Sequence, residues 1–393
     1  MSRRVKLSEI ASFQTGPFGT QLKASEYSAT GTPVINVKNI GYGNLILNDL
    51  DYVPATVCSR LSNHLLKKGD IVFGRKGSVD RHCYIKEENE NWMQGSDCIR
   101  VRVEKGINSR YISYYLMLDR VKKQINNSSV GSTMASINTD ILKTVEIILP
   151  DSERQNSIAA LLTIIDEKIE NNNKINAELE SMAKTIYDYW FLQFEFPNED
   201  GKPYKSSGGK MVWNEELKRE IPAGWKQGTF FDLIEIGNGK DHKGLHNGKV
   251  PVYGSGGVMR FVDKAIYDGE SVLIPRKGTL NNIIYVNGAF WTVDTMFYSK
   301  MKMDHTAIFT YYSVRLYDFE KLNTGTGVPS MTSSIIYDLK TIIPTRKILK
   351  DFDLAVQSFY KQIQANRKEN EELASLRNFL LPLLMNGQVS FKE

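Results

Sequence analysis

Hydrophobic positions recur every seven residues along two long stretches of the chain. In the first stretch the two series are Ile158, Ile165, Asn172, Leu179 and Ile186, and Leu161, Lys168, Ile175, Met182 and Tyr189. In the second they are Phe352, Phe359, Asn366, Leu373 and Leu380, and Ala355, Gln362, Glu369, Leu376 and Leu383. Two such series, sustained over five heptads, predict helices of the coiled-coil type. We therefore expect two long helices that pair with each other.

An asparagine occupies the same core position in each expected helix. Asn172 and Asn366 both belong to the first series of their stretch. A buried Asn lowers the stability of a coiled coil but fixes its register, because the amide needs a partner. We expect these two residues to set the register of an antiparallel pair. The alternative is that both amides face solvent.

The chain is a tandem duplication. The segment Gly131-Ser-Thr-Met-Ala-Ser-Ile137 returns 194 positions later as Gly325-Thr-Gly-Val-Pro-Ser-Met331. The same offset holds without a gap through the following helix, where residues 169–181 return as residues 363–375. A fixed offset over such a length indicates two copies of one structural unit.

Short hydrophobic runs bounded by turn residues precede each helix, as in mixed α/β domains. The expected strands are Val34–Val37, Asp70–Phe73, Ile99–Val103 and Val145–Leu149 in the first copy, and Val250–Tyr253, Ser271–Ile274, Ile283–Val286 and Lys340–Ile343 in the second. We expect an α+β fold with two tandem mixed α/β domains, each followed by a long helix, and the two helices pairing as an antiparallel coiled coil.

The expected boundaries follow the repeat. The first mixed domain is residues 1–150 and its helix 151–196, and the second mixed domain is 225–344 and its helix 345–393. Residues 197–224 are rich in Gly, Ser and Pro and carry five charges of each sign, which is typical of a linker.

Composition narrows the class of protein. Hydrophobic residues make up 41% of the 393 positions, enough for sizeable cores. No run approaches the ~20 apolar residues of a membrane span, and the first residues lack the apolar segment of a signal peptide. Three scattered cysteines, Cys58, Cys83 and Cys98, favour a reducing compartment over disulfides or a zinc site. We expect a cytoplasmic protein.

Charge is unevenly distributed. Residues 1–150 carry 20 Lys and Arg against 14 Asp and Glu, whereas residues 151–196 carry 4 against 9. A basic globular part suits a surface that meets phosphates. An ordinary basic surface is the alternative.

Motifs of common enzyme classes are missing. No Gly-Lys pair is followed by Ser or Thr as in a phosphate-binding loop, and the chain has no Pro-Pro of an amino-methyltransferase motif. Gly-x-Ser-x-Gly and His-Glu-x-x-His are also absent. His242 and His246 lack an acidic partner and indicate a surface loop rather than a metal site. Asp200 with Glu216-x-Lys218 matches a nuclease pattern, but these residues lie in the expected linker.

Two similar turns carry the residue types best suited to DNA. Arg75-Lys76-Gly77 and Arg276-Lys277-Gly278 follow apolar runs in the two copies, and Asp97 and Asp294 also correspond. A glycine lets the backbone approach a phosphate, and adjacent Arg and Lys can neutralise it or reach guanine O6 and N7. The alternative is a strand-end turn with solvated charges. Weaker DNA-binding candidates are Lys38, Asn39, Lys240 and Lys243.

The sequence resembles the specificity subunit of type I restriction–modification enzymes over essentially its whole length. The resemblance is carried by Leu7-Ser-Glu-Ile10, the run at 69–72, Gly131-Ser-Thr before a strand, Glu153-Arg-Gln155 and Ile164-Ile-Asp166 in the first helix, and the segment 203–225. In the second copy Lys347-Ile348-Leu349 stands where the first helix has Glu-x-Gln.

This resemblance implies two target recognition domains, each reading half of a bipartite DNA site, and no catalytic residues. It implies that the helices act as spacer and as docking surface for two copies of the modification methyltransferase subunit, and that restriction/translocase subunits can join. No cofactor is expected on this chain, since S-adenosylmethionine and ATP belong to the partner subunits. Two alternatives remain: a scaffold or DNA-mimic inhibitor without DNA affinity, which should be acidic, and a fused methyltransferase–nuclease, which should carry motifs.

Overall fold

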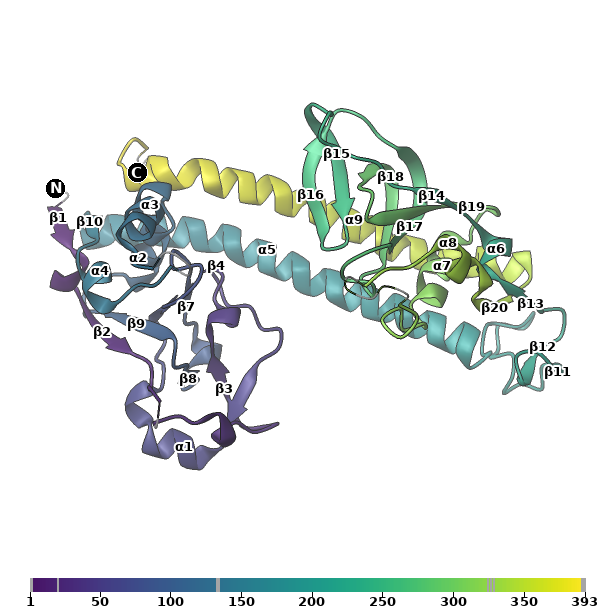
Figure 1. Ribbon diagram of the computed structural model, residues 1–393, viewed down its shortest axis with the longest axis horizontal. Helices are drawn as coiled ribbons and strands as arrows, with labels where there is room; N and C mark the ends of the chain where they lie inside the picture. The colour runs from purple at the N-terminus through teal and green to yellow at the C-terminus, as the bar shows by residue number, and fades with distance from the viewer. Residues whose placement is uncertain are drawn as a thin grey trace. The chain divides into compact units, whose positions relative to one another are not determined.

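The computed structural model describes residues 3–19, 21–131, 135–323, 325, 327 and 329–389. It divides into two compact units, Met1–Asn172 with Lys368–Glu393, and Asn173–Arg367. Each unit contains one sheet-rich domain and part of each long helix (Figure 1). The linear boundaries expected from the sequence keep each helix whole, whereas the compact units divide both helices. Residues 132–134, 324, 326 and 328 of the repeated motif lie outside the described residues.

The first unit is built on a five-stranded sheet with the order β2-β9-β6-β7-β4, beside a three-stranded sheet, β5-β3-β8, and the pair β1-β10. The strands are β1 (Arg3–Lys6), β2 (Ala11–Thr15), β3 (Thr32–Ile35), β4 (Tyr42–Gly43), β5 (Asp51–Val53), β6 (Ile71–Gly74), β7 (His82–Tyr84), β8 (Met93–Gln94), β9 (Cys98–Val103) and β10 (Glu146–Leu149). The short helices are α1 (Ala55–Arg60), α2 (Ser109–Leu116), α3 (Asp119–Ser128) and α4 (Thr139–Lys143). The four strands expected in this copy are confirmed, with slightly shifted ends.

Helices cover one face of the five-stranded sheet. Side chains alternate between the two faces of a strand, so Ile71 and Phe73 of β6 share a face with Ile99 and Val101 of β9. All four are fully buried. The same core includes Tyr111, Tyr115, Ile158, Leu162, Leu381 and Leu384, from α2 and both long helices. The first sheet domain therefore packs on segments of both long helices in its own unit.

The second unit is built on a six-stranded sheet with the order β14-β19-β17-β18-β15-β16. Its strands are β11 (Met211–Asn214), β12 (Arg219–Pro222), β13 (Lys226–Thr229), β14 (Ile234–Asn238), β15 (Asn247–Gly254), β16 (Gly257–Val262), β17 (Tyr267–Pro275), β18 (Ile284–Thr292), β19 (Met296–Met301) and β20 (Lys340–Ile343). The short helices are α6 (Phe230–Leu233), α7 (Ala307–Val314) and α8 (Ser333–Asp338). The four strands expected here are confirmed, and three of them are longer than the hydrophobic runs that predicted them.

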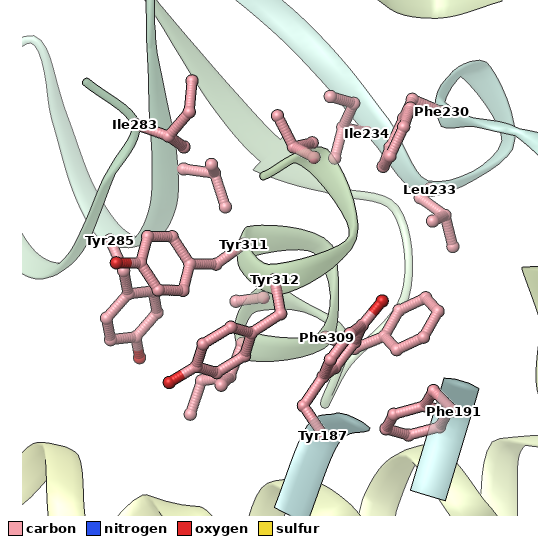
Figure 2. Close-up of a cluster of buried hydrophobic side chains, with 14 of the residues drawn as sticks. Tyr187, Phe191, Phe230, Leu233, Ile234, Ile283, Tyr285, Phe309, Tyr311 and Tyr312 are labelled. Atoms are coloured by element: carbon pink, nitrogen blue, oxygen red, sulfur yellow. The ribbon is translucent and has the colours of Figure 1, made fainter. Parts of the chain in front are cut away.

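Aromatic rings form the centre of the second core. Figure 2 shows Tyr187 and Phe191 of the first long helical stretch lying against Phe309 and Tyr312 of α7. The ring centroids of Phe191 and Phe309 are 4.8 Å apart, with an edge-on interplanar angle of 67°. Such pairs contribute about 0.5–1.5 kcal/mol beyond the burial of their area. Every residue of α7 is buried, so this helix lies in the interior of the second unit, packed between the sheet and the long helices.

The segment 197–224 is not the simple linker that its composition predicts. It contains the antiparallel hairpin β11-β12, and Ile221 belongs to the core of the second unit. The Phe196 ring stacks on Tyr204, at 4.5 Å between centroids, and on Trp225, at 5.1 Å. A few widely spaced aromatic and aliphatic side chains make this packing. Polar residues outnumber them in the segment, so its composition alone predicts a linker.

The two long helices run antiparallel within each unit. They are α5 (Ser152–Tyr187), which continues as a π-helix (Asp188–Leu192), and α9 (Arg346–Met385). In the first unit Asp166 accepts a hydrogen bond from Arg377 and Asn172 donates one to Asn370, so residue numbers rise on α5 as they fall on α9. In the second unit the corresponding pairs are Asn176–Asn366 and Tyr187–Phe352. Among the described residues, no helix is long and apolar enough to cross a bilayer.

The second heptad series expected for each helix is displaced by one residue. Ile175, Met182 and Tyr189 are 39%, 50% and 40% exposed. The inward positions of the first helical stretch are Leu162, Ile169, Asn176 and Ala183 on α5 and Trp190 on the π-helix. Those of α9 are Val356, Ile363, Asn370, Arg377 and Leu384. A heptad seam can alternate steps of three then four residues, or of four then three. Both series carry apolar residues, so only packing distinguishes them.

A buried histidine lies in the first unit. His82 of β7 is 1% exposed, and its Nε2 lies 3.0 Å from the hydroxyl oxygen of Ser113. Burial lowers the pKa of His82 to about 3, because the imidazolium would lose its hydration. The folded chain therefore keeps this ring neutral in mild acid.

This histidine should make the first unit sensitive to acid. As pH falls from 6.5 toward about 3, the unfolded chain binds a proton at His82 that the folded chain does not bind. The free energy of unfolding therefore decreases. The contribution is ~1.4 kcal/mol per pH unit. Urea unfolding of the wild type and His82→Gln over this range measures it, since Gln can still bond to Ser113 but cannot be protonated. Equal pH dependence in the two proteins would contradict the expectation.

Candidate nucleic-acid interface

The Arg75-Lys76-Gly77 turn of the first unit is held at both ends by backbone hydrogen bonds. The Arg75 N–H donates to the Asp97 carbonyl at 2.8 Å, and the Gly77 N–H donates to the Ala135 carbonyl at 2.8 Å. The Arg75 carbonyl accepts from the Ile137 N–H at 3.0 Å. Gly77 has φ = 79°, a left-handed conformation that favours glycine. The end of the repeated motif thus fastens the turn.

The second unit repeats this arrangement. The Arg276 N–H donates to the Thr295 carbonyl at 2.8 Å, and the Gly278 N–H donates to the Pro329 carbonyl at 3.3 Å. The Arg276 carbonyl accepts from the Met331 N–H at 2.9 Å, and Gly278 has φ = 88°. The turns suggested by sequence are therefore equivalent in three dimensions.

The geometry corrects one correspondence between the copies. Asp97 is equivalent to Thr295, because each supplies the carbonyl that holds its turn; the sequence had matched it to Asp294. In the first unit the Lys76 ammonium lies 3.1 Å from the Asp97 carboxylate. No ion pair holds Lys277 among the described residues of the second unit. The two turns have the same backbone arrangement, but among the residues that the structure describes the lysine charge is paired with an acidic residue in the first turn and not in the second.

Both turns lie at the same kind of sheet edge. In the first unit β2 and β6 end on either side of the start of β9, so the 16–19 loop and the turn are neighbours. In the second unit β14 and β17 end on either side of the start of β19. A loop and a basic turn therefore meet at one edge in each unit.

An exposed aromatic residue adjoins the first turn. The Arg75 guanidinium lies 4.7 Å from the ring centroid of Phe18, which is 42% exposed. A guanidinium that rests on an aromatic face keeps its N–H groups free to bond at its edge. Phe18 was not among the residues predicted from the sequence, where its one signal is its position in the turn-like segment Gly16-Pro-Phe-Gly19.

Lys240 and Lys243 lie in the loop that follows β14 in the second unit. The Lys240 N–H donates to the Thr292 carbonyl at 2.9 Å, and its carbonyl accepts from the Trp291 indole at 2.9 Å. The side chains of Lys240 and Lys243 are exposed. Since Gly239 donates to the Met296 carbonyl next to Thr295, this loop lies beside the Arg276 turn. The structure brings these two lysines and the second turn together.

Lys38 is held by acidic neighbours in the first unit. Its ammonium lies 2.8 Å from the Asp49 carboxylate and 3.1 Å from that of Asp51. The hydrogen bond to Asp49, followed by that to Asp51, raises the pKa of Lys38. Much of this charge is compensated within the protein, so a phosphate would have to compete for it.

Asn39 does not have the exposed position expected of a DNA-reading side chain. It is fully buried, and its amide donates to the carbonyls of Ile46 at 3.1 Å and Asn48 at 3.2 Å. Its oxygen accepts from the Asn36 N–H at 3.2 Å. Asn39 holds its loop together, and the sequence could not reveal this because the amide chemistry of the two roles is identical.

The two helix asparagines are buried and hydrogen-bonded across the helix pair, but not to each other. Asn172 donates to the side chains of Asn370, at 2.9 Å, and Glu369, at 2.6 Å. Asn366 donates to the side chain of Asn176 at 2.9 Å. Each residue therefore pairs with the position four residues beyond its repeat equivalent. This follows from the antiparallel direction of the helices. Among the described residues, no cluster of three or more His, Cys, Asp or Glu could hold a metal ion.

Comparison with known proteins identifies the family. Residues 3–181 and 222–375 match the model of the type I restriction modification DNA specificity domain. The chain is 26% identical over 314 residues to the type I restriction enzyme MjaIX specificity subunit of Methanocaldococcus jannaschii, covering 73% of this chain and 71% of that one. It is 21% identical over 404 residues to the HindI specificity subunit of Haemophilus influenzae, covering 82% and 87%.

The fold is also that of a solved structure. The crystal structure of the type I restriction–modification S subunit from M. genitalium matches with a TM-score of 0.59 at 17% identity, covering 98% of this chain and 96% of that one. The expected α+β fold of two tandem domains with long helices is confirmed. The family model describes a DNA specificity domain and not a catalytic one, and it matches both copies. The chain therefore belongs to the family of type I restriction–modification DNA specificity subunits.

Proposed function

We propose that this chain reads a bipartite DNA target, with the Arg75 turn of the first unit and the Arg276 turn of the second each lying against one half-site. The main support for this proposal is that equivalent backbone hydrogen bonds hold the two turns. The chain therefore presents the same kind of basic edge twice. Lys240 and Lys243 extend the second edge. The phosphate contacts would position each domain, and side chains near the turn would read bases.

The proposal includes partner subunits. Ile175 and Met182 of α5 and Tyr189 of the π-helix that continues it expose apolar surface, which supports docking of a modification methyltransferase subunit on this helical stretch. Two such subunits, and restriction/translocase subunits with them, would form the complex in the cytoplasm. S-adenosylmethionine and ATP would be bound by those subunits, so this chain would need neither.

The turns should contribute to DNA affinity. Replacing Arg75 and Lys76 by Ala should weaken binding and reduce the slope of log K against log salt by about one for each phosphate that is no longer neutralised. If Arg75 reads a guanine, one target position should also relax, by about 1–3 kcal/mol. Salt-titrated binding measures the slope and methylome sequencing measures the target. The control Lys6→Ala with Lys105→Ala removes equal charge from exposed positions elsewhere. Equal effects of both double substitutions would mean that only net charge matters.

Specificity should be modular. Replacing residues 225–344 by the same region of another family member should change one half-site and leave the half-site of the first domain unchanged. The physical reason is that, among the described residues, the backbone hydrogen bonds that hold each turn come from its own unit. Methylome sequencing of cells that carry the chimera with its partner subunits gives the result directly. If both half-sites change together, recognition is not divided in this way.

The helix pair should set the distance between half-sites. One heptad inserted after Leu179 of α5, with a matching heptad after Gln362 of α9, keeps both amide pairs intact. At 1.5 Å per residue the insertion adds about 10 Å, or roughly three base pairs of unread DNA. The methylome should show a longer gap between unchanged half-sites. An active complex with an unchanged gap would show that the helices are not the spacer, and a heptad added to α5 alone should disrupt the pairing.

A further inference from the structure

A polar cleft of about 320 Å³ opens on the first unit. Its lining includes Gln14 of β2, Arg100 and Arg102 of β9, and Ser62, Asn63 and Lys67 from the segment before β6. Alternation along β9 puts Arg100 and Arg102 on the face opposite Ile99 and Val101, away from the helices. None of the described residues that line this cleft, called here the Arg100 cleft, is acidic.

Arg100 is a nearly buried cation with only neutral partners. It is 7% exposed. Its Nη1 donates to the Asn63 carbonyl at 2.9 Å and its Nη2 donates to the side-chain oxygen of Gln14. Its Nε has no partner among the described residues. Burial lowers the pKa of Arg100 and the nearby charge of Arg102 lowers it further, while the charge of Asp70 opposes both effects more weakly. A buried cation without an anion is unfavourable, so this position is suited to receive one.

The Asp70 carboxylate, which lies beside Arg102, is already engaged in hydrogen bonds. Asp70 accepts from Nε and Nη2 of Arg102, both at 2.7 Å, and from the Lys67 N–H at 2.8 Å. This pairing uses one edge of the Arg102 guanidinium, and the described residues give its Nη1 no partner. The cleft thus holds two guanidinium groups against one carboxylate, with the exposed Lys67 ammonium at its rim.

The cleft is distinct from the turn proposed to meet DNA. The Arg75 turn bonds to Asp97, before β9 begins, whereas the cleft lies along β9 at Arg100 and Arg102. The positive charge of Lys76 in the turn is paired with Asp97, but that of Arg100 has no acidic partner among the described residues.

We propose that the Arg100 cleft binds an oxyanion of the phosphate type, either free phosphate or a phosphate group of a DNA backbone. Two positive charges, on Arg100 and Lys67, are left without a carboxylate, which matches the one to two negative charges of a phosphate group. Free N–H groups of both guanidiniums, the Ser62 hydroxyl and the Asn63 amide supply hydrogen-bond donors of the kind that its oxygens accept.

The first arm of the test uses inorganic phosphate and the full-length chain. Binding to the folded state should raise the thermal unfolding midpoint in phosphate above that in chloride at equal ionic strength. Lys67→Glu and Arg100→Gln should abolish this difference, with affinity for phosphate reduced about tenfold or more. Lys68→Glu is the matched control, because Lys68 is also exposed but pairs with Glu87 and does not line the cleft.

The second arm identifies the source of the phosphate with a random-sequence DNA duplex. If the group belongs to the DNA backbone, Lys67→Glu should reduce the salt slope of binding by about 0.9 relative to Lys68→Glu. If the slopes are equal but phosphate stabilises the chain through the cleft, the ligand is free phosphate. Lys67→Glu keeps the test decisive if Arg100→Gln does not fold.

Equal phosphate responses in the wild type and all folded variants, together with equal salt slopes, would overturn the proposal. The DNA arm rests on the proposed function, whereas the phosphate arm does not. A wild-type chain that binds phosphate in the cleft but no DNA would therefore contradict only the proposed function.

Discussion

The structure depends on each sheet domain burying its helical face against segments of both long helices at once. In the second unit the Phe191 ring lies 4.8 Å from Phe309 of α7 and 4.9 Å from Phe352 of α9, so one aromatic side chain joins the domain to both helices. In the first unit Leu162 of α5 and Leu384 of α9 enter the core of the sheet domain. The core of each domain is therefore completed by side chains from both helices, which is why each compact unit contains parts of both.

Polar contacts favour one alignment of each domain on the helices. In the first unit Asp166 accepts from Arg377 of α9 at 2.8 Å and from the Tyr114 hydroxyl of α2 at 2.7 Å. In the second unit the Tyr360 hydroxyl of α9 donates to that of Tyr312, at 2.9 Å. One copy fixes its domain on the helices with an ionic network and the other with paired phenols. A shift of register would leave the partly buried Asp166 and the buried phenols without these partners, so the contacts favour one alignment.

The sequence predicted the type of side chain at the candidate interface, but only some of the individual residues. Both Arg-Lys-Gly turns proved to be equivalent, because a strand followed by a basic turn and a glycine is a local pattern. Asn39 was misjudged, since only the folded loop shows that its amide bonds to nearby carbonyls. Phe18 and Arg100 were missed, because each acquires its role from residues far away in the chain.

The sequence alone determined the duplication, the order of domains and helices, and the positions of the expected strands, because these depend on local periodicity and on a constant offset between copies. Only the tertiary structure decided which of two apolar stripes faces inward on each helix: Ile175 and Met182 are exposed, while Asn176 and Ala183 are buried. It also turned a polar segment, 197–224, into part of the second core. The physical reason is the same in both cases. A side chain's burial is set by what packs against it, and that partner lies elsewhere in the sequence.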